Sequence, residues 1–217
     1  MAVIKGKPID SRISYQPLLH KTDCFESMQI PAIIELEYEQ WLNNAIRCIS
    51  PFYNDRPDAD DISLLVIHCI SLPRGCYRNQ MVQHLFQGRL GCFSHPELKN
   101  VATLNVSAHL FIDRVGTCYQ FVPFNRRAWH AGISCFEGVD NCNDYSIGIE
   151  LEGIDDGSFT TLQYNRLVEV SRLLVNHYPR MTHERIVGHS DIAPERKTDP
   201  GNGFDWSYYR QQLLGNS

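Results

Sequence analysis

Residues 144–152 read Asp-Tyr-Ser-Ile-Gly-Ile-Glu-Leu-Glu, and this stretch says most about the fold. Apolar residues alternate with others, which is the pattern of a β-strand that buries one face. The buried side is expected to hold three aliphatic residues, Ile147, Ile149 and Leu151. Glu150 and Glu152 then share the opposite face with Gly148. The stretch therefore predicts a strand that presents two carboxylates opposite an aliphatic core.

Other segments have the patterns of strands and helices. Residues 63–68 read Ser-Leu-Leu-Val-Ile-His, an apolar run typical of a buried strand that ends on a histidine. Thr160 and Gln163 form a capping-box pattern ahead of a helix that stops before Pro179. Further elements are expected as a helix over 78–87, a hairpin over 107–122, a helix over 206–214, and loops over 91–104 and 188–204. Residues 41–49 suit either a helix or an edge strand.

Together these elements predict one α/β domain, with a central mixed β-sheet flanked by helices. Its expected boundaries are residues 38–217. Three prolines interrupt residues 1–37, and we interpret this segment as an N-terminal extension. The 217 residues are enough for one hydrophobic core.

The composition limits the partners and the cellular location. The chain has 20 Lys and Arg against 25 Asp and Glu, so no nucleic-acid partner is expected, since such proteins usually have a basic excess. No apolar run approaches the roughly 18 residues of a membrane span, and no membrane insertion is expected. Residues 1–8 lead into no apolar stretch, which predicts no secretory signal. The eight cysteines form no CxxC pair, and we interpret them as reduced thiols that fill space in a cytoplasmic protein. We expect a monomer.

Ionisable residues gather in three places where a core does not need them. His68 ends a buried strand, and Glu150 and Glu152 share a strand face. Residues 188–201 are rich in polar groups, and loops that follow strands often hold catalytic residues. The sequence has no local HExxH or CxxC zinc signature, so spacing alone does not pair His68 with His189.

Five motifs in order give a more specific indication. They are Ser63–His68 with Ser71-Leu72-Pro73, Val106-Ser-Ala-His109, Arg127-Ala-Trp-His-Ala-Gly132, Cys142-Asn-Asp-Tyr-Ser-Ile-Gly-Ile-Glu-Leu-Glu-Gly153, and Gly188-His189 through Pro200-Gly201. In these motifs the chain resembles the cytosolic 1,6-anhydro-N-acetylmuramyl-L-alanine amidase family, which belongs with the type 2 amidases and peptidoglycan recognition proteins. The resemblance covers about residues 40–214.

The resemblance implies a zinc site with one Zn²⁺ ion and the ligands His68, His189 and Asp199. Two imidazoles and one carboxylate leave a fourth position for water, as catalytic zinc sites require. The resemblance also makes Glu150 the general base and gives Lys197 the role of stabilising the transition state. The implied reaction is hydrolysis of the amide between (1,6-anhydro-)N-acetylmuramic acid and L-alanine in muropeptides, for peptidoglycan recycling in the cytoplasm.

Several residues have alternative readings. Trp129 is either a core residue or, with His130, a wall of the substrate cleft. Asn105 and Asn141 stand where relatives can have basic residues that hold substrate carboxylates, and Arg74, Arg126 and Arg127 are candidates to compensate. Asp191 is an alternative oxygen ligand to Asp199, and Glu152 is expected as a surface or supporting carboxylate. His109 is expected to be structural, and four histidines are expected to be solvated: His84, His95, His177 and His183.

Two other functions remain open at this point. One is a peptidoglycan sensor that binds the fragment without cutting it, although such proteins commonly lack a metal ligand and all three are present in this sequence. The other is an amidase of the cell envelope that acts on intact wall. A different divalent ion on the same ligands is the second choice of metal.

Overall fold

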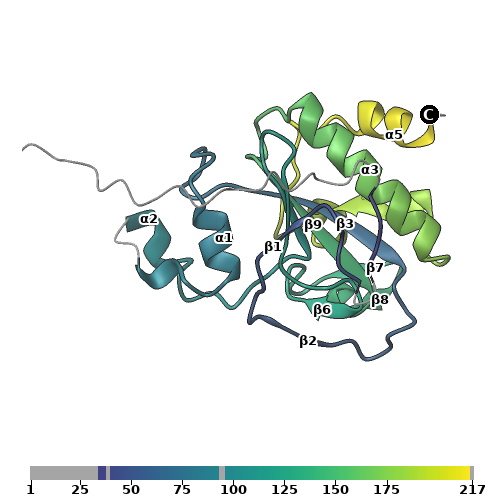
Figure 1. The fold of residues 1–217 in the computed structure, drawn as a ribbon, viewed down its shortest axis with the longest axis horizontal. Helices are drawn as coiled ribbons and strands as arrows, with labels where there is room; N and C mark the ends of the chain where they lie inside the picture. Colours follow the sequence, from purple (N-terminus) through teal and green to yellow (C-terminus); the bar gives the residue numbers. More distant parts are fainter. Residues whose placement is uncertain (1–33, 38–39, 93–95, 216–217) are drawn as a thin grey trace, which may run out of the picture. The chain divides into compact units, whose positions relative to one another are not determined.

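Two apolar strands lie at the centre of the fold (Figure 1). β3 (Leu64–Ile70) and β9 (Ser146–Glu152) run parallel, and their register places His68 opposite Glu150. The computed structural model describes residues 34–37, 40–92 and 96–215. Both strands predicted from the apolar patterns are confirmed, each within two residues of its expected ends.

These strands belong to a six-stranded sheet with the order β1-β5-β4-β9-β3-β10. The β4–β5 pair is antiparallel, as the predicted hairpin requires, and the other neighbours pair in parallel. The shorter strands of this sheet are β1 (Ile46–Arg47), β4 (Leu110–Ile112), β5 (Cys118–Gln120) and β10 (Ile186–Gly188). Two small antiparallel pairs lie outside it: β2 (Tyr53–Asp55) with β6 (Arg126–Ala128), and β7 (Cys135–Phe136) with β8 (Val139–Asp140). The predicted central mixed sheet is therefore confirmed.

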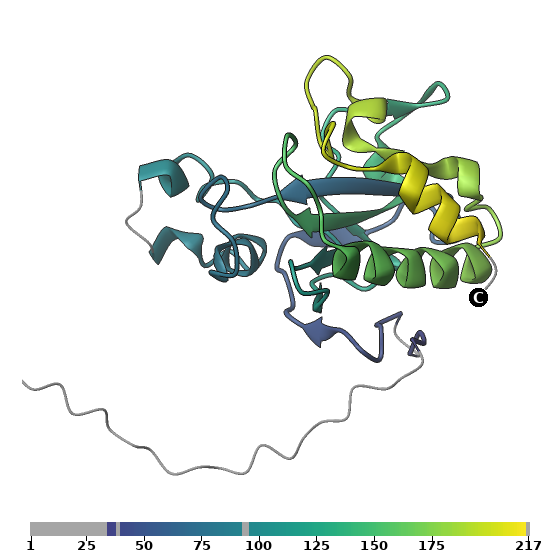
Figure 2. The same ribbon diagram turned by 90° about the horizontal axis from the view of Figure 1, so that it is seen from above.

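Helix α3 (Thr161–His177) packs on one face of the sheet, and α5 (Trp206–Leu214) packs beside α3 (Figure 2). The aliphatic face predicted for β9 is fully buried against α3: Ile147, Ile149 and Leu151. The predicted capping box is present, because Thr160 Oγ1 accepts the Gln163 N–H and Gln163 Oε1 accepts the Thr160 N–H, both at 3.1 Å. The opposite face of these two strands buries Leu64 and Val66 in a separate apolar cluster, and further along the strands it holds His68 and Glu150.

Four segments differ from the sequence-based prediction or resolve it. Helix α1 (Met81–Phe86) begins three residues late, because Asn79 Oδ1 accepts the Met81 N–H at 3.1 Å and Gln80 is left-handed, with φ 63°. The predicted loop at 91–104 contains α2 (Pro96–Lys99), and the predicted loop at 188–204 begins with α4 (His189–Ile192). Residues 41–49 include the edge strand β1 and no helix. Within the described residues, three 3-10 turns complete the elements: Leu90–Cys92, Cys142–Asp144 and His183–Arg185.

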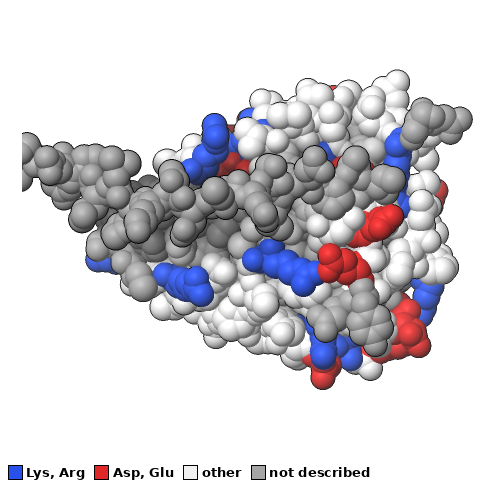
Figure 3. Space-filling view, in the orientation of Figure 1, with Lys and Arg blue, Asp and Glu red and all other residues white. Residues whose placement is uncertain are grey.

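The surface and the cysteines complete the description. Basic and acidic side chains are interspersed among uncharged ones on the face in Figure 3. None of the helices in the described part of the chain is long and apolar enough to cross a membrane.

Cys118 and Cys142 are buried free thiols, as expected, whereas Cys76 and Cys135 are exposed and therefore do not fill space in the core. The predicted extension at 1–37 lies outside the described residues except for 34–37, as do Cys24 and His95.

Candidate metal and catalytic site

The sheet brings the predicted metal ligands together. Strand β10 pairs with β3 and leads directly into α4, whose first residue is His189. His68 lies on the face of β3 that points away from α3, because its neighbours along the strand alternate into the core. The loop after α4 brings Asp199 back, and its carbonyl accepts the Ser190 N–H at 2.9 Å.

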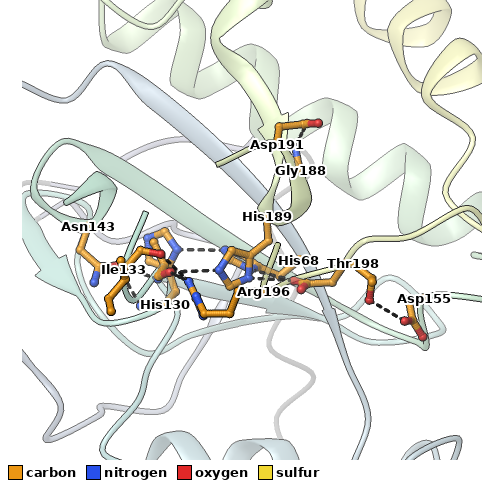
Figure 4. A network of polar contacts seen from close by, with 12 residues as sticks. His68, His130, Ile133, Asn143, Asp155, Gly188, His189, Asp191, Arg196 and Thr198 are labelled. Atoms are coloured by element: carbon orange, nitrogen blue, oxygen red, sulfur yellow. Dashed lines mark hydrogen bonds and ion pairs between the residues drawn. The ribbon is translucent and has the colours of Figure 1, made fainter. Parts of the chain in front are cut away.

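Three donor atoms form a nearly equilateral triangle. Figure 4 shows the imidazoles of His68 and His189 next to each other. His68 Nδ1 lies 2.9 Å from His189 Nδ1 and 3.0 Å from Asp199 Oδ2. The distance from His189 Nδ1 to Asp199 Oδ2 is 3.1 Å. A four-coordinate zinc ion with bonds of about 2.0–2.1 Å separates its ligands by roughly 3.3 Å. The triangle is close to that size, so these residues can hold a metal ion.

The protonation states also suit a metal ion. Burial lowers the pKa of His68 to about 4, so its imidazole is neutral at pH 7. Burial alone would raise the pKa of Asp199, but the imidazoles of His189 and His68 outweigh this effect and keep the pKa below its ordinary value. Neutral imidazoles and ionised carboxylates are the forms that bind metals. The donor set thus fits zinc in its chemistry as well as its spacing.

Asp191 is not part of this triangle. Its Oδ2 accepts the Gly188 N–H at 2.7 Å, and its carboxylate points away from the imidazoles in Figure 4. The geometry therefore favours Asp199 over Asp191 as the oxygen ligand.

Glu150 stands beside His68 on the neighbouring strand. Its Oε2 is buried and has no hydrogen-bond partner among the described residues. Burial raises the pKa of Glu150 well above its ordinary value, the charge of Asp199 adds to the rise, and Lys197 opposes it. A buried carboxyl group with a raised pKa and an unpaired oxygen is suited to accept and return a proton near neutral pH.

An open groove of about 300 Å³ begins at Asp199. It is lined by residues 69–71, 74, 153–155 and 196–199. Arg74 Nη2 lies 2.7 Å from Asp155 Oδ1, and Thr198 Oγ1 donates to Asp155 Oδ2 at 2.7 Å. Burial raises the pKa of Cys69, so this thiol faces the groove uncharged. The groove therefore presents basic side chains, an acidic side chain and an uncharged thiol next to the three donor atoms.

The four residues predicted to contact substrate have different surroundings. Trp129 is partly exposed, and its Nε1 donates to Asn54 Oδ1 at 2.9 Å. Asn105 and Asn141 are exposed. His130 instead lies against the predicted ligands, with its Nδ1 2.9 Å from His68 Nε2. Of the four, only His130 is shown in direct contact with a predicted ligand among the described residues.

The other histidines and Glu152 can be compared with the positions predicted for them from the sequence. His109 is fully buried and its Nδ1 accepts the Gly148 N–H at 3.0 Å, which confirms a structural histidine. Glu152 is only 3% exposed and accepts the N–H groups of Arg78 and Arg114 at 2.5 and 3.0 Å. Of the two predicted positions for Glu152, the surface one is therefore wrong, and the supporting one agrees with these two backbone hydrogen bonds. His177 is exposed as predicted, whereas His84 and His183 are partly buried.

Three residues at the site were not among the sequence-predicted ones. Asn143 Oδ1 accepts the backbone N–H groups of His130 and Ala131. Arg196 Nη2 donates to the Ala131 carbonyl at 2.6 Å, and the buried Arg56 reaches the Asn143 carbonyl at 3.2 Å. Each contact joins a side chain to backbone far away in sequence, so no spacing pattern reveals it. The motif that begins at Cys142 contained Asn143, but it did not indicate what this side chain binds.

Known proteins resemble this chain in sequence and in fold. The family model for N-acetylmuramoyl-L-alanine amidase matches residues 58–202. The chain belongs to this amidase family. Among curated members of the amidase family, the 1,6-anhydro-N-acetylmuramyl-L-alanine amidase AmpD of Citrobacter freundii is 48% identical over 179 residues, which are 82% of this chain and 95% of that protein. The resemblance found in the motifs is thereby confirmed.

Solved structures of amidases agree. A crystal structure of a selenomethionine derivative of AmpD has a TM-score of 0.79 and 47% identity, over 82% of this chain and 99% of the other. The amidase AmiD of Escherichia coli, in complex with the substrate anhydro-N-acetylmuramic acid-L-Ala-D-γ-Glu-L-Lys, has a TM-score of 0.54 and 29% identity, over 84% of this chain and 66% of AmiD. The predicted fold, a mixed sheet flanked by helices, is the amidase fold.

Proposed function

We propose that this chain is a zinc-dependent amidase, which hydrolyses the amide between 1,6-anhydro-N-acetylmuramic acid and L-alanine in soluble muropeptides. The observation that supports it most is the triangle of His68, His189 and Asp199 donor atoms beside the unpaired Oε2 of Glu150, in a member of the amidase family. The three donor residues would hold one Zn²⁺ ion. When bound, zinc polarises a carbonyl group and lowers the pKa of water toward about 7.

Glu150 acts as the proton carrier in this proposal. Its free Oε2 accepts the proton of the attacking water and then passes it to the nitrogen of the departing L-alanine. The raised pKa helps the first step, because a more basic carboxylate accepts the proton of water more readily.

Lys197 supplies positive charge near the reacting carbonyl. It follows Arg196 in the loop that ends at Asp199, and it is close enough to Glu150 to oppose the rise in the pKa of that carboxyl group. We assign it the stabilisation of negative charge on the amide oxygen in the transition state.

The groove next to Asp199 is the proposed place of the stem peptide. Arg74, Arg196 and Lys197 line it together with Asp155, so it offers partners for carboxylate and ammonium groups of a peptide. Asn105 and Asn141 are uncharged, and Arg74 is therefore the proposed anchor for a peptide carboxylate. Trp129 is assigned to the wall for the sugar. The proposed location is the cytoplasm, and the proposed state is a monomer.

The test is product analysis by mass spectrometry. Zinc-loaded protein is incubated with anhydro-muropeptide and, separately, with intact peptidoglycan; a chelated sample and the Asp199→Ala variant are the controls. We expect free stem peptide from the soluble fragment, little release from the wall, and loss of both in the controls. Equal cleavage of the two substrates would support the proposed amide hydrolysis but would favour an amidase of the cell envelope. Tight binding of the fragment without cleavage would contradict the proposal in favour of a sensor.

A further inference from the structure

Both histidines of the triangle contact one dipeptide on their far side. His68 Nε2 lies 2.9 Å from His130 Nδ1, and His189 Nε2 lies 3.0 Å from the Ala131 carbonyl oxygen. Each imidazole therefore has one nitrogen in the triangle and the other on residues 130–131. A metal-binding histidine commonly donates its second N–H in this way, which fixes its tautomer and ring orientation.

The contacts define one consistent set of tautomers. A carbonyl oxygen can only accept, so His189 has its proton on Nε2 and its Nδ1 lone pair faces the triangle. For His68 Nδ1 to present a lone pair as well, the His68 proton must be on Nε2 and must be donated to His130 Nδ1. His130 then has its own proton on Nε2, which lies 3.2 Å from Ser146 Oγ, a group that can accept it.

The dipeptide is held from three sides. Asn143 Oδ1 accepts the N–H of His130 at 3.0 Å and the N–H of Ala131 at 2.8 Å. Arg196, from the loop that bears Asp199, donates to the Ala131 carbonyl at 2.6 Å. The third side is Gly148, over which the His130 ring lies: a Cβ at Gly148 would stand 2.5 Å from His130 Nδ1 and 2.6 Å from Cδ2, closer than atoms can pack. A glycine at this strand position is thus required by the His130 ring.

We propose that the His130–Ala131 dipeptide, fixed by Asn143, sets the tautomer and orientation of both histidine ligands. His130 and Asn143 are then positioning residues and not substrate contacts. This inference rests on the zinc site of the proposed function, and it adds residues that act through the ligands.

The experiment measures the dissociation constant of Zn²⁺ by competition with a chromophoric chelator, and the melting temperature of each protein in EDTA. His130→Ala removes the acceptor for His68 and should weaken zinc binding about 10- to 100-fold. His130→Asn keeps an acceptor oxygen near the position of Nδ1 and should restore most of the affinity. Gly148→Ala should weaken zinc binding by displacing the ring. Gly91→Ala, where an added Cβ meets nothing within 4 Å, is the matched control and should bind zinc like the wild type.

The outcomes separate this inference from the proposed function. Wild-type zinc affinity in His130→Ala would overturn it. Equal weakening in His130→Ala and His130→Asn, in parallel with a lower melting temperature in EDTA, would also overturn it, because a merely structural role predicts that result. Wild-type protein that binds zinc but cleaves no muropeptide would contradict the proposed function alone. Wild-type protein that binds no zinc would contradict both.

Discussion

His68 of β3 and Glu150 of β9 are direct register partners on adjacent parallel strands, and their side chains leave the same face of the sheet. A metal ligand and a proton carrier at these positions are held by two central strands, and their separation does not depend on a loop. Sites on strands keep catalytic groups in place better than sites on loops. The roles proposed for the two residues lead to separate expectations for each.

Glu150→Gln should keep zinc and lose turnover by about 10²- to 10⁴-fold, because the amide cannot accept a proton. The measurement is kcat on anhydro-muropeptide together with the zinc content of the purified variant. Turnover near that of the wild type would remove Glu150 from the mechanism.

Glu152→Gln is the control two residues along the same strand. Glu152 accepts two backbone N–H groups, and an amide offers one acceptor oxygen in place of two. We expect this variant to lose about 1–3 kcal/mol in the free energy of unfolding and to retain its turnover. Denaturant titration measures the expected loss of stability, and the same kcat assay measures the expected retention of turnover. A large loss of kcat in the folded variant would contradict the assignment of proton transfer to Glu150 alone.

Asp199→Ala should abolish tight zinc binding, whereas Asp191→Ala should retain it. The first substitution removes one corner of the donor triangle, and the second removes only the acceptor of the Gly188 N–H, worth about 1 kcal/mol of stability. Zinc affinity by chelator competition distinguishes the two aspartates. The reverse order of affinities would make Asp191 the ligand.

Lys197→Met should lower kcat by about 10²- to 10³-fold, because the transition state loses a positive partner for its developing charge. Zinc affinity should change little. The uncharged Met has a similar length, so packing is largely preserved. A variant whose KM rises while kcat is unchanged would show that Lys197 binds substrate and has no part in the chemical step.

The stability of the metal-free protein should fall as the pH decreases from 7 to 5. Burial, and secondarily the charge of Arg56, holds the pKa of His109 well below its ordinary value of 6.5. The folded state therefore does not bind the proton that the unfolded state takes up below about pH 6.5, and acid favours unfolding. His109→Asn should reduce the slope of stability against pH by up to about 1.4 kcal/mol per pH unit. Urea titrations in EDTA at several pH values measure the slope, and an unchanged slope would contradict this account.

Local patterns predicted the parts of the fold that obey them. The alternation at Ile147, Ile149 and Leu151 and the capping box at Thr160 both match the structure. Helix α2 was missed because four residues are too few to show a helical period, and its Leu98 is buried by tertiary contacts. The ligand set came from the motifs of the family, and the structure now brings those side chains together.

The contacts around the ligands were beyond prediction for a different reason. Asn143 binds backbone N–H groups, and any residue type at 130 and 131 would supply the same groups, apart from proline. The sequence left Glu152 as either a surface or a supporting carboxylate, because strand alternation gives the face of a residue and not what covers it. Only the fold shows that the backbone at Arg78 and Arg114 covers this end of β9.

The buried guanidinium of Arg56 has a consequence for the boundaries of any shorter fragment of this chain. Its nitrogens lie 2.8–3.3 Å from four carbonyl oxygens, those of Phe124, Asn143, Asp144 and Ser146. The span matched by the amidase family begins two residues later, at 58, and ends at 202, before α5. A fragment trimmed to that span would leave these carbonyls without their donor and would expose the side of α3 on which α5 packs. We therefore expect a fragment of residues 58–202 to be less stable than one that also includes Arg56 and α5.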